Sequence, residues 1–463
     1  MEAEFIDRKN ELAFLEENWN DADYKAKFII LWGKRRVGKT ELVKEFIKDK
    51  PKIYFLSENT SNNEQLKRFS QAVGNFFNEP LLKVRGFSEW EESFDYIKRK
   101  NEKFILVIDE FPYLIQSNPV IPSLFQKAWD EYWSKTKLYL IILGSSVSIM
   151  ENEVLGYKSP LYGRRTAQYK IDPMPFNSIG LFRKHESFED RMMHYALGGG
   201  IPAYWLQFSE KKDFYGNLRD HVLKKGQFLY EEVEFVLREE LREPRYYFAL
   251  LQAIAQGKRK LSEIVNATGV TQSAANKYLS VLSDLVIVER EIPVTEEKPL
   301  KSKKGLYRIK DEFFAFWFAF VFPSRSRIEI GESESVIEEI KAGLDRYISF
   351  VYERVAIQIL LNNSEKLFRF SALGRWWDKN QEIDIIGINP SSNSIVFCEV
   401  KWSKKPVGLD IYENLKQKTK LVDWGEKNRK EFYCLFSKSG FTEAMIKLAR
   451  KENAVLFSGE NPA

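Results

Sequence analysis

The chain has 463 residues, 44% hydrophobic and 30% charged, with a formal net charge of +5. This length suits two to four globular domains, and the mild charge permits a nucleic-acid partner without requiring one. No apolar run reaches membrane-spanning length, Met1-Glu2-Ala3-Glu4 lacks signal-peptide features, and Cys398 and Cys434 are the two cysteines. We therefore expect a cytoplasmic protein with no membrane partner and no disulfide framework.

The first strong motif lies in residues 28–40, where an apolar run leads into a glycine-rich loop and then a helical pattern. It matches the phosphate-binding loop G-x-x-x-x-G-K-[ST], whose glycines let backbone N–H groups face phosphate oxygens at a helix N-terminus. Lys39 would reach the β- and γ-phosphates, and the Thr40 hydroxyl would ligate Mg²⁺. The predicted nucleotide site comprises Gly33, Lys34, Arg35, Arg36, Val37, Gly38, Lys39, Thr40 and Glu41.

Two further apolar runs, residues 104–110 and 138–146, are typical of strands buried in a parallel sheet. The first ends in Asp109 and Glu110, which we predict to hold Mg²⁺ and to polarise the attacking water, respectively. The second ends in hydroxyls, so Ser145 or Ser146 could contact the γ-phosphate or that water. Alternation of strands and helices indicates a doubly wound α/β fold.

These segments resemble the archaeal-type ATPases, a family related to the AAA+ and STAND nucleotide switches. The likeness runs from about Phe5 to Tyr230 and implies a P-loop NTPase fold with a parallel sheet and a helical lid. It also implies ATP and Mg²⁺ as cofactors and would allow a homo-oligomer formed through the ATPase domain. In that family Asp109 belongs to the Walker B strand, and Ser145 corresponds to sensor 1.

Two other segments resemble this family. In residues 160–166, Arg164 or Arg165 is a candidate γ-phosphate-sensing arginine, acting in the same or a neighbouring subunit. In residues 198–202, Pro202 belongs to a lid element that packs near the adenine. The alternatives are a basic surface turn for the first segment and a helix stop without ligand contact for the second.

Residues 245–309 have the pattern of a winged helix-turn-helix. Helical runs flank a break at Thr268-Gly269-Val270, and two strand-like runs, 285–294 and 305–309, enclose a loop with four lysines. In DNA-binding members the second helix enters the major groove and the wing contacts phosphates. The candidate recognition helix carries Lys277 as its one cation, and Ser273 and Asn276 could read base edges. A protein-interaction module is the alternative.

The C-terminal part carries acidic residues and a lysine on strand-like runs. Asp384 is near the start of one run, and Glu399 and Lys401 stand two apart on the next, so both point to one face. This set resembles the PD-(D/E)xK nucleases, with Ile383 in place of the motif's proline and Glu353 as an additional acidic residue. Two carboxylates suit Mg²⁺, and a lysine beside it can activate water. A decayed nuclease fold kept for binding is the alternative.

We therefore expect five regions: 1–175, a P-loop ATPase core; 176–235, a helical lid; 236–325, a winged helix-turn-helix; 326–345, a linker; and 346–463, an α/β restriction-endonuclease-like domain. The leading hypothesis is an ATP-controlled switch coupled to DNA binding and Mg²⁺-dependent DNA cleavage. The alternatives are a nucleotide-gated DNA- or protein-binding regulator with an inactive nuclease fold, and a signalling ATPase whose C-terminal regions bind only protein.

Overall fold

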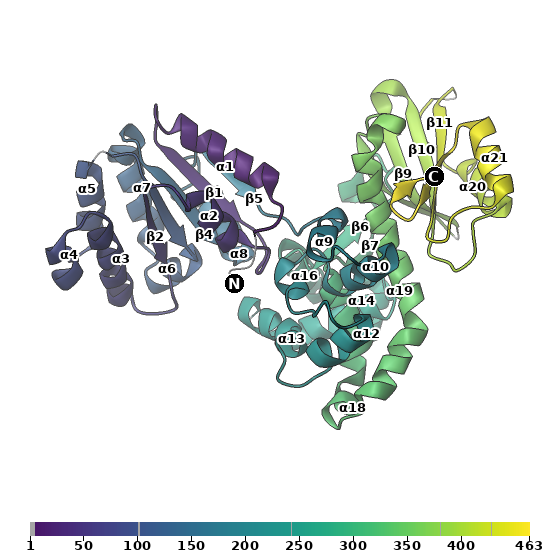
Figure 1. Ribbon diagram of the computed structural model, residues 1–463, viewed down its shortest axis with the longest axis horizontal. Helices are drawn as coiled ribbons and strands as arrows, with labels where there is room; N and C mark the ends of the chain where they lie inside the picture. Colours follow the sequence, from purple (N-terminus) through teal and green to yellow (C-terminus); the bar gives the residue numbers. More distant parts are fainter. Residues whose placement is uncertain (1–4, 101, 242, 380, 427) are drawn as a thin grey trace. The chain divides into compact units, whose positions relative to one another are not determined.

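The computed structural model describes residues 5–100, 102–241, 243–379, 381–426 and 428–463. They form two compact units, each considered separately below (Figure 1). The first unit spans Met1–Met174 and Ile201–Ala203, and the second spans Pro175–Gly200 and Tyr204–Ala463.

The first unit is built on a parallel sheet of five strands in the order β2-β3-β4-β1-β5. The central strands are buried on both faces, as expected for continuous apolar runs in a parallel sheet. The strands are β1 (Lys27–Trp32), β2 (Lys52–Leu56), β3 (Ile105–Asp109), β4 (Tyr139–Gly144) and β5 (Ala167–Lys170). Because β4 lies between β1 and β3, the carboxyl ends of these three strands adjoin one another.

Helices cover both faces of this sheet, as the doubly wound prediction requires. On one face, α1 (Lys9–Asp21) and α2 (Lys39–Ile47) contact β4, where the Tyr139 hydroxyl donates to the Leu15 carbonyl and the Tyr139 ring lies against Phe46. On the other face, side chains of the strands pack against helices from residues 62–133, and together they form one apolar cluster. Its helices are α3 (Asn62–Phe76), α4 (Pro80–Arg85), α5 (Trp90–Lys100), α6 (Phe111–Ser117) and α7 (Ile121–Glu131).

The second unit begins with short helices and continues with three helices and a β-hairpin. The first set is α9 (Phe176–Phe182), α10 (Phe188–Gly198), α12 (Phe214–Asn217) and α13 (Phe228–Glu240). The second set, which we call the helix–hairpin module, is α14 (Pro244–Ala255), α15 (Leu261–Thr268), α16 (Gln272–Asp284), β6 (Val288–Glu291) and β7 (Leu306–Ile309). Strands β6 and β7 are antiparallel, and Gly269, at φ +66°, ends α15 before Thr271 caps α16. Assignment of this module as a winged helix stays a prediction.

Residues 326–329 and 333–345 are helical, so most of the predicted linker is helix rather than an irregular connection. Helix α18 covers Arg325–Glu329, and the 30-residue helix α19 covers Ser333–Asn362. Val336, Ile340 and Leu344 are buried at helical spacing along α19, which explains why the segment folds against its neighbours despite its charge.

A six-stranded sheet ends the chain, in the order β13-β12-β11-β10-β9-β8. Strands β8, β9 and β10 are antiparallel, whereas β10, β11 and β12 are parallel. Its elements are β8 (Ala372–Asp378), β9 (Gln381–Asn389), β10 (Ser394–Lys401), α20 (Leu409–Thr419), β11 (Lys430–Ser437), α21 (Glu443–Glu452), β12 (Val455–Ser458) and β13 (Asn461–Pro462). Cys398 and Cys434 are paired in register on β10 and β11, buried and free.

Among the residues described, no helix combines the length and the apolarity that crossing a membrane requires.

Candidate functional site

The phosphate-binding loop connects β1 to α2 in the first unit. Gly33 has φ +150°, and a Cβ there would stand 2.3 Å from the Ile171 carbonyl oxygen, so no larger residue fits without moving the backbone. Gly38, at φ +92°, precedes the first residue of α2. Lys39 is buried, and its Nζ donates to the carbonyls of Gly33 (3.0 Å) and Lys34 (2.8 Å). The loop thus holds its lysine beside its own backbone.

The Asp109 carboxylate, at the carboxyl end of β3, accepts several hydrogen bonds. Its Oδ2 accepts from the Thr40 hydroxyl at 2.9 Å and from the Tyr54 hydroxyl at 2.6 Å, and its Oδ1 accepts from the Glu110 N–H at 2.8 Å. The Thr40–Asp109 bond joins the two predicted magnesium ligands of this site, one at the start of α2 and the other at the end of β3. Such a hydroxyl–carboxylate pair is the donor set that P-loop proteins use for Mg²⁺, so these residues fit that ion.

Glu110 is held by Ser145 at the end of β4. The Ser145 hydroxyl lies 2.7 Å from both carboxylate oxygens of Glu110, and the Ser145 N–H donates to Oε2 at 3.3 Å. Glu110 has a left-handed backbone, φ 52°, at the N-cap of α6. The predicted Asp109, Glu110 and Ser145 therefore adjoin the phosphate loop, and Ser145, one of the two serines considered, bonds Glu110.

Sequence reasoning missed Tyr54, and Arg8 also contacts this site. Tyr54, on β2, bonds Asp109, and burial together with that bond raises the pKa of its hydroxyl. Arg8 is buried and donates to the Val37 carbonyl of the loop at 2.8 Å and to Glu11 at 2.8 Å. A tyrosine in a strand carries no signal of its own, because only the strand order brings β2 beside β3.

Arg164 and Pro202 were predicted to contact the nucleotide. Their contacts described here are not with the phosphate loop, Asp109 or Glu110. The Arg164 guanidinium bonds Asp130 of α7 and the Tyr162 carbonyl. Pro202 is the first residue of α11 (Pro202–Trp205), just after Gly199 at φ +57° ends α10. The helix stop is therefore present, and contact of either residue with a nucleotide stays a prediction.

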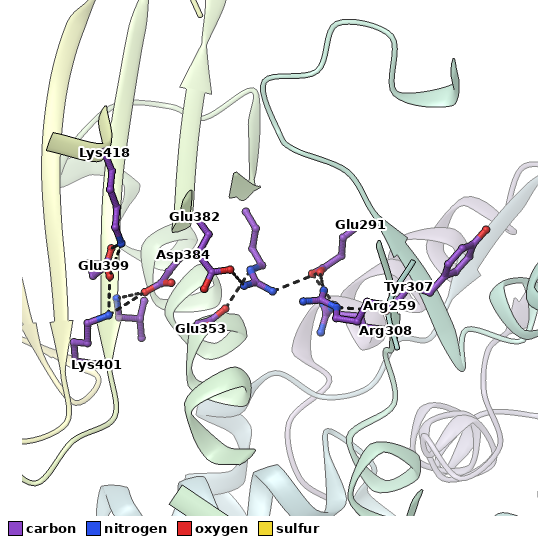
Figure 2. Close-up of polar contacts among 12 residues, drawn as sticks. Arg259, Glu291, Tyr307, Arg308, Glu353, Glu382, Asp384, Glu399, Lys401 and Lys418 are labelled. Atoms are coloured by element: carbon purple, nitrogen blue, oxygen red, sulfur yellow. Dashed lines mark hydrogen bonds and ion pairs between the residues drawn. The ribbon is translucent and has the colours of Figure 1, made fainter. Parts of the chain in front are cut away.

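A second polar cluster lies on β9 and β10 of the second unit (Figure 2). The Lys401 Nζ is 2.7 Å from Glu399 Oε1 and 3.8 Å from Asp384 Oδ2, so the predicted trio is assembled. Asp384 also accepts the Val400 N–H at 2.8 Å. Around Asp384 the register of β8 against β9 shifts, since Trp376 pairs with Ile383 but Gly374 pairs with Ile386. This β-bulge gives β9 an additional residue, and bulges commonly redirect side chains beside functional sites.

Two cations that were not predicted from the sequence form ion pairs with carboxylates of this cluster. The Lys418 Nζ, from α20, lies 3.1 Å from Glu399 Oε1. The Arg375 guanidinium lies 3.4 Å from Glu353 Oε2 and 3.0 Å from Glu382 Oε2. Glu353, predicted as an additional metal ligand, is therefore paired with an arginine.

Burial is the largest single influence on the pKa values of the residues in this cluster. Burial, and then the charge of Glu399, raise the pKa of Asp384 above its usual range. Burial likewise raises the pKa of Glu353, although Arg375 opposes it. For Lys401 burial alone would lower the pKa, but Asp384 and Glu399 raise it. The lysine thus stays charged and partly neutralises two carboxylates that repel each other.

In the described part of the chain, no three acidic, histidine or cysteine side chains come close enough together to hold a metal ion. The predicted set of Glu353, Asp384 and Glu399 is therefore not gathered as one ligand group. Mg²⁺ commonly takes only one or two protein carboxylates and completes its shell with water and substrate oxygens. Asp384 and Glu399, which already share Lys401, still fit an ion of that kind.

Comparisons with known proteins agree with the first site and leave the second open. Residues 5–208 match the ATPase domain predominantly from Archaea, and residues 317–418 match a family of archaeal and bacterial proteins of unknown function. The uncharacterized protein MJECL04 of Methanocaldococcus jannaschii is 39% identical over 454 residues, covering 97% of each chain. The uncharacterized ATP-binding protein MJ0423 of that organism is 56% identical over 46 residues, 10% of this chain and 75% of the relative.

Among solved structures, the Walker-type ATPase PABY2304 of Pyrococcus abyssi is similar with a TM-score of 0.51 and 22% identity. The match covers 68% of this chain and 96% of that one. At this identity the likeness concerns the fold, which is that of a P-loop ATPase.

Proposed function

Since the chain belongs to an archaeal ATPase family in which this domain precedes a C-terminal domain of unknown function, we propose that it is a Mg²⁺-dependent ATP-hydrolysing switch. The observation that carries the proposal is the hydrogen-bonded series Thr40–Asp109–Glu110–Ser145 beside the phosphate loop. Each member stands at the carboxyl end of a central strand or at the start of α2, where open α/β sheets bind ligands.

The residues of this site divide the work of hydrolysis. The loop N–H groups and Lys39 bind the phosphates, and Thr40 and Asp109 would hold Mg²⁺, which neutralises charge on the phosphate oxygens. Glu110 accepts the proton of the attacking water, and Ser145 holds the Glu110 carboxylate in place. Arg8 fixes the loop through the Val37 carbonyl and so preserves the shape that receives the phosphates.

The test is ATP binding and turnover by the full chain with and without Mg²⁺. We expect Lys39→Ala to lose measurable ATP binding, because the buried Lys39 ammonium is the group that the loop pattern places at the β- and γ-phosphates. Lys44→Ala is the matched control, since Lys44 lies on the same helix and forms an exposed ion pair with Glu41. ATP affinity that is the same in Lys39→Ala and wild type would contradict the proposed site.

A second proposal concerns the C-terminal cluster: Mg²⁺-dependent cleavage of nucleic acid. It is supported by Asp384, Glu399 and Lys401 lying together on β9 and β10, and by the helix–hairpin module, whose element order is that of a winged helix. In this reading the carboxylates would hold the ion, which would activate water, and Lys401 would orient that water.

The alternative, a binding module without cleavage, is favoured by the additional cations. Lys418 pairs with Glu399 and Arg375 pairs with Glu353, so the carboxylates are already neutralised without a metal. Incubation of DNA and RNA with Mg²⁺ or Mn²⁺, with and without ATP, separates the two readings. For a nuclease, Asp384→Asn should abolish cleavage, whereas Glu443→Gln, at an exposed position on α21, should not. Absence of cleavage by the wild-type protein under every condition would leave the binding module.

A further inference from the structure

A polar groove of about 1100 Å³ lies between the helix–hairpin module and the β8–β9 hairpin. One wall comes from α15, α16 and β7, and the other comes from the ends of β8 and β9. Both walls belong to the second unit. The groove is thus a feature of that unit, separate from the nucleotide site.

The groove is strongly cationic. Two carboxylates, Asp378 and Glu382, line it together with six cations: Lys260, Arg290, Lys303, Lys304, Arg375 and Lys379. Within the described residues, the ion pairs of these cations involve only Lys304, which lies 3.6 Å from Glu296, and Arg375. The four lysines are exposed. The groove therefore presents positive charge to an anionic ligand, as a nucleic-acid backbone requires.

The same groove contains aromatic rings and amide side chains. Tyr307 of β7 and Trp377 of β8 are half-buried and line it, and Gln272 and Asn276 project from the first turns of α16. Cations that follow a phosphate backbone, combined with aromatic faces on which bases stack, are typical of sites for single-stranded nucleic acid. Amide side chains can add hydrogen bonds to exposed base edges.

The facing wall argues against a duplex in this groove. A helix that reads duplex DNA inserts its side chains into the major groove and must therefore be accessible along that face. Here the ends of β8 and β9 line the same groove as Gln272 and Asn276, so this face of α16 is not open on every side. A ligand that reaches these residues passes between two protein walls, which a single strand with unstacked bases can do.

The groove also leads toward the carboxylate cluster. Arg375 lines the groove and pairs with Glu353. Glu382 also lines the groove and stands two residues before Asp384 on β9, and Figure 2 labels both acids. Tyr307 and Arg375 line both the groove and an adjoining cavity of about 700 Å³ that reaches Asp384. A strand bound in the groove would therefore extend to the residues proposed for cleavage.

We propose that this groove binds a single strand of nucleic acid, which deepens and rests on the proposed nucleic-acid role of the second unit. The test is fluorescence anisotropy of labelled oligonucleotides with the full chain in EDTA, so that cleavage cannot intervene. Single-stranded DNA, single-stranded RNA and a blunt duplex of the same sequence are compared. Tighter binding of one or both single strands than of the duplex is expected, and the DNA and RNA arms identify the sugar.

The variant Lys303→Gln/Lys304→Gln removes two groove cations. At about 0.1 M salt it should weaken single-strand binding about twentyfold and reduce the slope of log affinity against log salt by about 1.4. The control Lys447→Gln/Lys451→Gln removes the same charge from exposed positions on α21, outside the groove, and should leave both quantities unchanged. Trp377→Leu should weaken binding about tenfold with an unchanged salt slope.

Two results would overturn the proposal while sparing the nucleic-acid role: tighter binding of the duplex, or equal weakening by the two double lysine variants. Failure of the wild-type protein to bind any of the three oligonucleotides would overturn both.

Discussion

At the residue scale, the decisive contact in the ATPase site is the one between Ser145 and Glu110. A hydroxyl that bonds both oxygens of a carboxylate fixes its orientation, and hydrogen bonds to charged groups contribute about 1.5–3 kcal/mol. Glu110 can accept a proton only if it faces the attacking water, so Ser145 acts through Glu110 as a positioning residue.

We predict that Ser145→Ala lowers the ATPase kcat by about 10- to 100-fold, the equivalent of that hydrogen-bond energy. ATP affinity should change little, because Ser145 bonds Glu110 rather than the phosphate loop. Ser146→Ala is the matched control and also decides between the two serines that the sequence left open. A kcat that falls in Ser146→Ala and not in Ser145→Ala would contradict this assignment.

The residues of the nucleotide site were predictable from sequence to the extent that they belong to a local motif. Gly33, Lys39 and Thr40 are fixed by spacing, and Asp109 and Glu110 by their place after a buried run. Tyr54, Lys418 and Arg375 were not, because each reaches its partner from an element distant in the sequence. Such contacts depend on strand order and helix packing, for which a single sequence carries no local signal.

At the element scale, the turn from β1 into the phosphate loop depends on Gly33. The Ile171 N–H donates to the Trp32 carbonyl at 2.7 Å. This bond holds Ile171, the residue after β5, against the loop. A Cβ at Gly33 would meet the Ile171 carbonyl, whereas a Cβ at Gly38 would meet no atom within 4 Å. The two glycines therefore serve different purposes although both have positive φ.

We predict that Gly33→Ala destabilises the first unit more than Gly38→Ala does. Gly38→Ala adds only the backbone strain of a left-handed residue, about 1–3 kcal/mol, while Gly33→Ala adds a steric conflict with backbone that must move. Thermal unfolding of the two variants without nucleotide measures the difference. Equal unfolding temperatures, or a lower one for Gly38→Ala, would contradict the steric argument.

Element types were largely predictable, and element limits were not. The patterns at 285–294 and 305–309 predicted two strands, and the structure contains the shorter β6 and β7 there. The error at 326–345 arose because Glu and Lys side chains on the exposed face of α19 masked its apolar spacing. Burial against the neighbouring helices, a tertiary effect, decides the state of such a segment.

At the scale of the whole molecule, the chain combines a P-loop ATPase with a C-terminal region that carries its own polar cluster and cationic groove. If ATP binding changes the affinity for nucleic acid, thermodynamic linkage requires that nucleic acid change the affinity for ATP by the same factor. A switch of this kind needs a state in which ATP is bound and not hydrolysed. Glu110 is the residue whose substitution should isolate that state.

The central claim is most directly tested by measuring ATP binding and ATP hydrolysis in Glu110→Gln. Glutamine keeps the size of the side chain and a hydrogen-bond acceptor for Ser145, but it cannot take a proton from water. We predict ATP affinity within about threefold of wild type and a kcat lower by at least about 100-fold, in line with the loss of a general base. Hydrolysis at the wild-type rate would show that Glu110 is not the base and would contradict the mechanism proposed for this ATPase.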